Sequence, residues 1–305
     1  MKPASRSGIL SVEKGPGVTS FQVVAYLRRL LRASKVGHGG TLDPDASGVL
    51  PILIGEATKL TPYLVDLDKE YLATVRLGIV TDTQDVSGTT LATRPVPGLG
   101  REEITARLTA FVGEITQVPP MYSALHHEGK RLYELARAGV EVERAPRRVT
   151  VHAVTLESVE LPSFTIRVRC GKGMYVRTLA ADLGEAFGCG AALARLIRTR
   201  VGPFTLEASV PWSELRDCRH GTMLWERLLP PDRALEGMPA VRLEVSQLEA
   251  FRHGRSVSWR ESPEGPVRVY GPDGRFHGLG LGRDGTVKPE RLLHADPPRP
   301  RVLPA

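Results

Sequence analysis

The chain has 305 residues, of which 41% are hydrophobic and 25% charged, a composition typical of a folded globular protein. No apolar run reaches the ~20 residues of a membrane-spanning helix, and the first residues lack the apolar core of a secretory signal, so we expect a cytoplasmic protein. Its three cysteines, Cys170, Cys189 and Cys218, form no CxxC pair, which argues against a disulfide framework and a thiolate zinc site. HExxH, P-loop and dinucleotide motifs are also missing, so we expect no metal and no cofactor.

Positive charge is concentrated in acid-free stretches of the sequence. The formal net charge is +7, and residues 14–42, 161–181 and 186–206 contain basic side chains but no Asp or Glu. Such stretches suit a polyphosphate partner, because each neutralised phosphate releases counterions. They also suit arginines solvated on helix faces, and charge alone leaves both interpretations open.

The first predicted element is an amphipathic helix that begins at Ser20, which we expect to cap it. It leads into a glycine-rich segment, residues 37–48, which we expect to be a loop carrying the candidate reactive side chains His38, Asp43 and Asp45. An aspartate in such a loop can be a nucleophile, a general base or a turn former that bonds its own backbone.

The following elements alternate between strands and helices. Residues 70–79 and 164–170 show the two-residue period of half-buried strands, and Tyr71 opens the buried face of the first. Residues 104–115 have the spacing of an amphipathic helix, and the chain is expected to be mostly helical from 172 to about 197. The absence of a regular βαβ rhythm favours an α+β fold with a mostly antiparallel sheet. From about residue 239 a small β-rich domain is expected, with a hairpin over 267–282 and a disordered tail over 296–305.

The glycine-rich loop carries the decisive motif. Residues 37–51, GHGGTLDPDASGVLP, resemble the GHxGxLDPxAxGxLP motif of the TruB family, the tRNA pseudouridine-55 synthases. The resemblance continues through GEATK (55–59), KEY (69–71), TDT (81–83), VPPMYSA (118–124), GKRLY (129–133), GMYVRT (173–178) and DLG (182–184). The C-terminal part is similar to the PUA-type RNA-binding domain of many members.

The resemblance implies a pseudouridine-synthase core with a mixed, mainly antiparallel sheet. The expected catalytic domain is 1–239, with a thumb-like insertion at 118–148, and the expected PUA-like domain is 240–305. The implied reaction converts uridine 55 in the TΨC loop of tRNA to pseudouridine. An isomerisation consumes no redox equivalent or group donor, which agrees with the missing cofactor motifs.

Three residues match the catalytic positions of the family. Asp43 matches the catalytic aspartate, which either attacks the substrate or removes the 2′ proton to form a glycal, and the sequence leaves both routes open. Arg177 matches the arginine that pairs with that aspartate; its alternative role is a phosphate contact. Tyr71 matches the active-site tyrosine, and a core tyrosine is the alternative.

Other matches concern substrate binding. His38 matches the histidine that fills the space left by the flipped-out base, and Tyr175 and Leu196 match the lining of the uracil pocket. The residues expected to contact RNA are Lys14, Lys35, Lys130 and Arg131. Two positions depart from the family pattern: Lys14-Gly15-Pro16-Gly17 replaces the usual Lys-Pro-x-Gly, and His126 stands where a lysine is common.

The resemblance also implies a monomer that acts on tRNA without a membrane. Two alternatives remain at this point. One is a noncatalytic RNA-binding or RNA-folding protein on the same core, which intact Asp43, Tyr71 and Arg177 disfavour. The other is an RNA-guided relative that acts within a complex.

Overall fold

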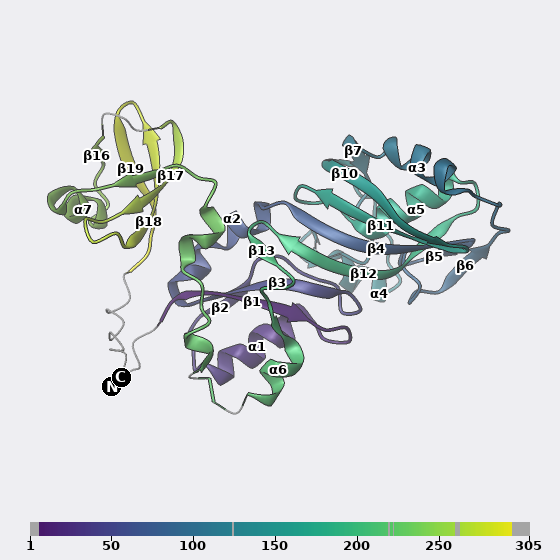
Figure 1. Ribbon diagram of the computed structural model, residues 1–305, viewed down its shortest axis with the longest axis horizontal. Helices are drawn as coiled ribbons and strands as arrows, with labels where there is room; N and C mark the ends of the chain where they lie inside the picture. Colours follow the sequence, from purple (N-terminus) through teal and green to yellow (C-terminus); the bar gives the residue numbers. More distant parts are fainter. Residues whose placement is uncertain (1–5, 124, 219, 222, 260–262, 295–305) are drawn as a thin grey trace. The chain divides into compact units, whose positions relative to one another are not determined.

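Figure 1 shows a computed structural model of the chain, which describes residues 6–294 apart from 124, 219, 222 and 260–262. The chain divides into two compact units, and neither is a continuous stretch of sequence. The first unit comprises residues 1–44, 49–65 and 202–305, and the second comprises 45–48 and 66–201. Among the described residues, no helix is long and apolar enough to cross a membrane. The expected tail at 296–305 lies outside the described residues.

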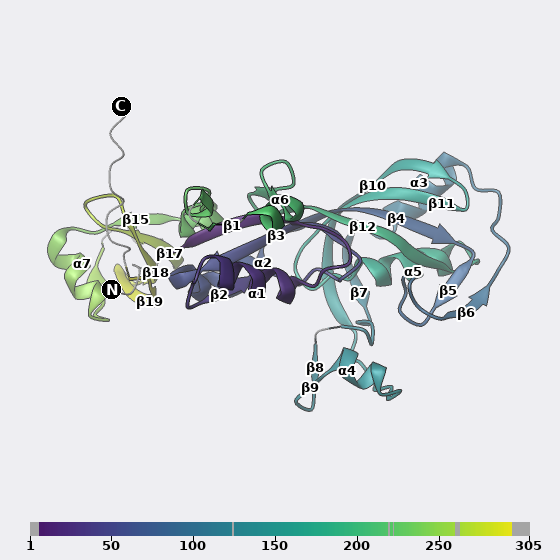
Figure 2. The same cartoon turned by 90° about the horizontal axis from the view of Figure 1, so that it is seen from below.

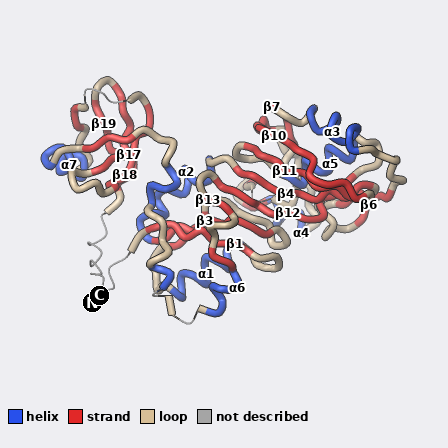
Figure 3. Tube along the Cα trace, in the orientation of Figure 1, coloured by secondary structure: helices blue, strands red, loops and turns tan. Residues whose placement is uncertain are grey.

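The first unit contains neighbouring strands of one sheet, in the order β14-β1-β3, with β2 paired to β3. β1 runs parallel to β14, and β2 is antiparallel to β3. Apolar side chains of α1 and α6 pack with those of β1 and β3 in one core, and Figure 3 shows both helices beside these strands. Outside residues 67–201, the elements up to residue 235 are β1 (Gly8–Lys14), α1 (Ser20–Leu30), β2 (Val36–His38), β3 (Ser47–Ile54), η1 (Gly55–Leu60), α2 (Thr61–Asp66), β13 (Phe204–Thr205), β14 (Val210–Pro211), α6 (Trp212–Asp217), η2 (Met223–Trp225) and η3 (Pro231–Leu235).

The residue that caps helix α1 lies one position before the one that the sequence predicts. Thr19, not Ser20, is the N-cap: its hydroxyl accepts a hydrogen bond from the Gln22 N–H, and the Gln22 side chain accepts one from the Thr19 N–H. This reciprocal pair is a capping box. The prediction that Ser20 caps the helix is therefore wrong, and the buried Ser20 hydroxyl bonds elsewhere.

The last part of the first unit is a five-stranded sheet in the order β15-β17-β18-β19-β16, packed against α7. Its elements are β15 (Ala240–Arg242), α7 (Val245–Arg252), β16 (Val257–Ser258), β17 (Gly265–Tyr270), β18 (Phe276–Arg283) and β19 (Thr286–Leu292). Phe251 of α7 is fully buried with Val267, Val269 and Val287 of the sheet. The hairpin predicted over 267–282 is confirmed as β17 and β18.

The second unit is built on the antiparallel strands β12-β4-β11-β10-β7. Ser47 and Gly48, the start of β3, pair in parallel with Ile197 and Arg198 of β12, so the sheet is mixed and mainly antiparallel, as expected. Helix α5 packs against β12 and α3 against β10. The elements are β4 (Lys69–Leu77), β5 (Ile79–Thr81), β6 (Thr90–Thr93), α3 (Arg101–Thr109), β7 (Gly113–Gln117), β8 (His126–His127), β9 (Lys130–Arg131), α4 (Leu132–Arg137), β10 (Arg147–Glu160), β11 (Ser163–Cys170), α5 (Val176–Ala186) and β12 (Ala191–Val201).

Two helices are shorter than the sequence predicts. Helix α3 ends at Thr109, and Gly113, at φ +104°, begins strand β7, so the helix predicted over 104–115 is only half helix. Helix α5 ends at Ala186, and the glycines 188 and 190 have φ of +75° and +71°, which an ordinary helix cannot continue through. Residues 191–201 form strand β12 instead of the predicted helix.

The error in β12 has a physical cause. Bulges interrupt its register with β4 between Leu193 and Arg195 and between Arg198 and Arg200. Each bulge adds one residue, so the buried residues fall at spacings of three and two rather than two throughout. That spacing imitates the 3.6-residue period of a helix.

Figure 2 shows β8, β9 and α4 projecting from the end of β7, away from the sheet of the second unit. The segment turns at Glu128 and Gly129, which have φ of +49° and +84°. Leu132 is buried, while Lys130 and Arg131 at the tip are exposed.

Candidate active site

Hydrogen bonds fix the backbone of the two residues on either side of Asp43, Leu42 and Pro44. The Ser20 hydroxyl accepts from the Leu42 N–H at 3.0 Å and donates to the Leu42 carbonyl at 3.1 Å. On the other side, the Pro44 carbonyl accepts from Lys14 Nζ and from the Gly17 N–H, both at 2.9 Å. The loop is therefore fixed immediately before and after Asp43, whose side chain is half-buried.

Lys14 is buried and donates hydrogen bonds to backbone carbonyls at and near this loop. It is 0% exposed, and Nζ donates to the carbonyls of Gly15, Val18 and Pro44 at 2.8–2.9 Å. A buried ammonium needs such acceptors, because it has left its hydration shell. The prediction that Lys14 contacts RNA is therefore wrong, and the residue shapes the Asp43 loop instead.

His38 ends strand β2, paired with Ile52 of β3. Its ring is half-buried, and Nδ1 accepts a hydrogen bond from the Gly40 N–H at 3.3 Å. An accepting Nδ1 places the proton of the neutral ring on Nε2. The predicted loop therefore begins with a strand, and its histidine is oriented by its own backbone.

Gly48 closes the loop in the second unit. Its φ is +112°, and a Cβ built on it would lie 2.2 Å from the Arg198 carbonyl oxygen. No side chain fits there, so the β3 backbone can run directly against β12 only because residue 48 is glycine.

Tyr71 lies on the buried face of β4. It is 9% exposed and stands in register with Arg198 of β12 and Val168 of β11. Leu196 is paired with Ala73, two residues along the same face, so Leu196 and Tyr71 share one side of the sheet. The structure thus brings together two of the predicted site residues and adds Arg198, which is 1% exposed.

Lys69 precedes Tyr71 by two residues on this face and is also buried. Burial and the nearby Arg198 guanidinium lower the pKa of Lys69 to about 8. Two buried cations therefore flank the tyrosine along the sheet. The sequence motif KEY (69–71) includes Lys69, but only the pairing of β4 with its neighbouring strands shows that Lys69 is buried.

Arg177 is the second residue of α5 and is 6% exposed. Nη1 donates to the Thr83 carbonyl at 3.2 Å and Nη2 to the Tyr122 carbonyl at 2.8 Å. Nη1 also lies 3.8 Å from Asp85 Oδ2. These partners fix the guanidinium in a buried position. The expected pair between Arg177 and Asp43 joins the two units and stays a prediction.

Asp85 is a neighbour of Arg177 that the sequence did not reveal. Its Oδ1 accepts from the Thr83 hydroxyl at 2.8 Å and from the Ser87 N–H at 3.1 Å, which leaves Oδ2 toward Arg177. The available signal was its place two residues after the TDT motif.

Tyr175 is positioned by a buried amide. Gln117 Oε1 accepts from the Tyr175 N–H at 3.1 Å, and Gln117 Nε2 donates to the Tyr175 carbonyl at 3.4 Å. The Gln117 side chain is buried at the end of β7. Tyr175 therefore precedes α5 in a fixed backbone conformation, and its ring is half-buried.

Comparison with known proteins decides the family. Residues 28–176 match the TruB family pseudouridylate synthase N-terminal domain, 177–236 the tRNA pseudouridylate synthase B C-terminal domain, and 239–293 the pseudouridine synthase II TruB C-terminal domain. A tRNA pseudouridine synthase B of Cupriavidus metallidurans is 46% identical, over 94% of each chain. The protein of that name from Aromatoleum aromaticum is 49% identical, over 94% of this chain and 92% of its own.

The chain belongs to the TruB family of pseudouridine synthases.

Solved structures agree with the TruB assignment. The crystal structure of a Cbf5-Nop10-Gar1 complex contains a chain that matches with a TM-score of 0.74 and 26% identity, covering 93% of this chain and 84% of its own. A structure of an H/ACA RNP bound to a substrate RNA containing 2′-deoxyuridine matches in fold, with a TM-score of 0.73, 24% identity and coverage of 94% and 85%. The expected pseudouridine-synthase core is confirmed.

The remaining residues expected in TruB–RNA contacts lie on the surface. Lys35, just before β2, and Lys130 and Arg131, in β9, are all exposed, as phosphate contacts require. Across the described residues, no group of three or more His, Cys, Asp or Glu side chains is arranged to hold a metal ion.

Proposed function

We propose that this chain isomerises uridine 55 in the TΨC loop of tRNA to pseudouridine. The observation that carries the proposal is similarity to tRNA pseudouridine synthase B at 46–49% identity over nearly the whole chain. Asp43, Tyr71 and Arg177 occupy the catalytic positions of the family motifs.

In this reaction the bond from C1′ to N1 breaks and a bond from C1′ to C5 forms. Asp43 starts the reaction, by attack on the substrate or by removal of the 2′ proton. C5 loses its proton and N1 gains one, so the product is an isomer of the substrate. The fixed backbone on both sides of Asp43 supports this role, because a positioned group acts without reorganisation.

Tyr71 and Arg177 assist Asp43 in this proposal. The Arg177 guanidinium orients the carboxylate and keeps it ionised, which its fixed hydrogen bonds support. Tyr71 stacks on the base and serves in proton removal from C5. Chemistry at C1′ and C5 requires the base to leave its stack, with His38 filling the vacated space and Tyr175 and Leu196 lining the uracil pocket.

The RNA surface extends beyond this pocket. We assign phosphate contacts to Lys35, Lys130 and Arg131, and closure on the RNA loop to the thumb-like insertion 118–148. Residues 240–305 act as a PUA-like domain that binds tRNA outside the T arm, and residues 1–239 form the catalytic domain. The protein works as a monomer in the cytoplasm and requires neither a metal nor a cofactor.

The test is substitution of Asp43 by Asn, which keeps its shape but removes the charge. Unmodified tRNA is incubated with pure protein, and pseudouridine is mapped by mass spectrometry or reverse transcription. We expect Asp43→Asn to form no product while still binding tRNA. Asp45→Asn is the matched control, since Asp45 is exposed in the same loop, and it should keep its activity.

Product formation by Asp43→Asn would refute the catalytic assignment. If the unaltered protein binds tRNA but forms no pseudouridine, the chain is an RNA-binding or RNA-folding protein instead. Activity that appears only after a guide RNA and partner proteins are added would favour an RNA-guided enzyme.

A further inference from the structure

The C-terminal five-stranded sheet is attached to the rest of the first unit by a group of polar contacts. On one side are Glu56 and Lys59 of η1 and Tyr63 of α2; on the other are Glu290 and Leu292 of β19 and His294. We call these contacts the docking seam. The GEATK motif contributes Glu56 and Lys59 to it.

Lys59 and Glu56 form the centre of the docking seam. Lys59 Nζ donates to the Leu292 carbonyl at 2.8 Å and pairs with Glu56 Oε2 at 2.5 Å. Glu56 Oε2 also accepts from the His294 N–H at 3.3 Å. Burial raises the pKa of Glu56, but the hydrogen bonds from Lys59 and His294 outweigh it and lower the pKa overall. The ionised carboxylate therefore fits the seam better than the neutral form.

Tyr63 adds a hydrogen bond from an uncharged side chain to the docking seam. Its hydroxyl donates to Glu290 Oε1 at 3.0 Å. Burial, followed by the hydrogen bond to Glu290, raises the pKa of Tyr63. The phenol therefore stays protonated and continues to donate at physiological pH.

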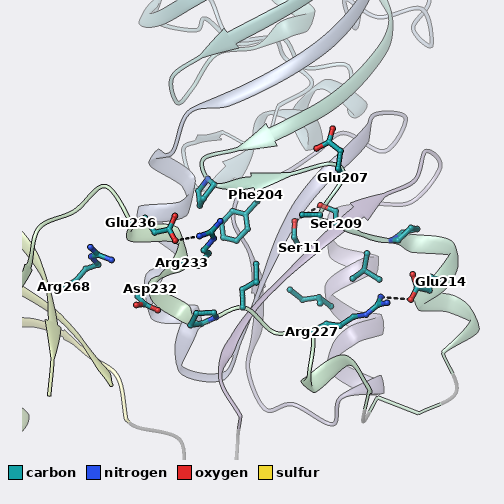
Figure 4. A pocket seen from close by; sticks show the side chains of 17 residues that line it. Ser11, Phe204, Glu207, Ser209, Glu214, Arg227, Asp232, Arg233, Glu236 and Arg268 are labelled. Atoms are coloured by element: carbon teal, nitrogen blue, oxygen red, sulfur yellow. Dashed lines mark hydrogen bonds and ion pairs between the residues drawn. The ribbon is translucent and has the colours of Figure 1, made fainter. Parts of the chain in front are cut away.

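The linker side of the same sheet is attached differently. Tyr270 of β17 donates to Asp232 Oδ2 at 2.6 Å, and Arg268 Nε donates to the Met238 carbonyl at 2.9 Å. Next to these residues is a cavity of about 700 Å³, lined by β1, the segment 203–211 and η3, with Arg268 at one edge (Figure 4). The linker thus borders open space instead of being packed throughout, and the docking seam supplies a second set of contacts that restrains the sheet.

We propose that Tyr63, Lys59 and Glu290 are positioning residues that hold the C-terminal domain in the orientation in which it binds tRNA outside the T arm. This inference rests on the proposed function. A domain already docked does not lose orientational freedom when tRNA binds, and preorganisation of this kind raises affinity. The effect is confined to substrates long enough to reach the domain.

Two substitutions test the proposal, and both are read on full-length tRNA and on a stem-loop with only the T arm. Tyr63→Phe removes one hydroxyl without changing charge. Glu290→Ala removes an acid, which by electrostatics alone should tighten binding to a polyanion. If the docking seam positions the domain, both variants instead raise KM for full-length tRNA, roughly five- to tenfold for one lost hydrogen bond. Turnover, and KM for the stem-loop, stay unchanged.

Two controls separate positioning from general destabilisation. Tyr26→Phe makes the same chemical change at a phenol that donates to the Leu215 carbonyl at 2.9 Å, away from the docking seam, and should leave both KM values unchanged. Glu290→Gln keeps an acceptor for Tyr63 and should restore KM toward the wild-type value.

The outcomes distinguish this inference from the proposed function. An unchanged KM for full-length tRNA in Tyr63→Phe, or a lowered KM in Glu290→Ala, overturns the positioning role. An equal rise for both substrates also overturns it, because the effect would not depend on the C-terminal domain. Absence of pseudouridine with the unaltered protein, in contrast, overturns the proposed function itself.

Discussion

At the scale of single residues, the site depends on side chains that hold other groups in place. Arg177 reaches two carbonyls and one carboxylate, which a lysine with a single point charge could not reproduce. Gln117 holds Tyr175 through both ends of its amide, and Ser20 holds Leu42 through both roles of its hydroxyl. The sequence motifs indicate the reaction, whereas these positioning hydrogen bonds can be seen only in the folded structure.

Asp85 offers a test of this support. In Asp85→Asn the amide oxygen can still accept from Thr83 and Ser87, but an NH2 group then faces the Arg177 guanidinium. We expect turnover to fall about tenfold, or ~1.4 kcal/mol of transition-state stabilisation, with tRNA binding maintained. Single-turnover kinetics measure this change.

The matched control is Asp82→Asn in the same loop. Asp82 Oδ1 accepts from the Thr89 N–H, and an amide oxygen can replace it there. Asp82→Asn should keep wild-type turnover. Equal losses in the two variants would mean that the loop, and not the charge beside Arg177, matters.

At the scale of secondary structure, glycines determine where strands can approach each other. Gly48 combines a left-handed φ with a position where a Cβ would overlap the β12 backbone. Replacing it requires β3 to move away from β12, and with it the end of the loop that carries Asp43.

Gly48→Ala is expected to reduce the free energy of unfolding by roughly 3 kcal/mol or more, through backbone strain and overpacking. Urea denaturation followed by circular dichroism measures the change. Gly188→Ala is the control: φ is +75° there, but nothing lies within 4 Å of the added Cβ, so the cost should be only about 1 kcal/mol. Similar losses in both variants would show that crowding at Gly48 is unimportant.

The sequence predicted those elements whose periodicity was regular. Strand β4 lies where alternation placed it, and the hairpin β17–β18 lies where strand-like runs on both sides of a turn placed it. Strand β12 was mistaken for helix because its two bulges shift the buried positions. The roles of Lys14 and Asp85 could not be derived, since both depend on contacts between distant or backbone atoms that no spacing encodes.

At the scale of the whole molecule, the reactivity of the three cysteines depends on how deeply each is buried. Cys170 and Cys189 are buried, and burial raises the pKa of Cys170 to about 12, so its reactive thiolate is scarce at pH 8. Cys218 is half-exposed, with its thiol near the His220 carbonyl.

We therefore expect one thiol per chain to react rapidly with Ellman's reagent in the folded state and three in denaturant. Cys218→Ser should abolish the rapid reaction and leave two thiols in denaturant. Rapid reaction of a second thiol in the folded Cys218→Ser variant would contradict the burial of Cys170 and Cys189.

Lys14 also bears on how the protein is made. Its ammonium reaches carbonyls of Gly15, Val18 and Pro44, and the Ser20 clasp on Leu42 lies within the same interval. These hydrogen bonds to Leu42 and Pro44, the neighbours of Asp43, thus come from the first 44 residues, with at most 30 positions between partners. Contacts of such short range close quickly, and synthesis delivers this end of the chain first. The ribosome therefore releases the residues that hold both neighbours of Asp43 long before Arg177, its expected partner, is translated.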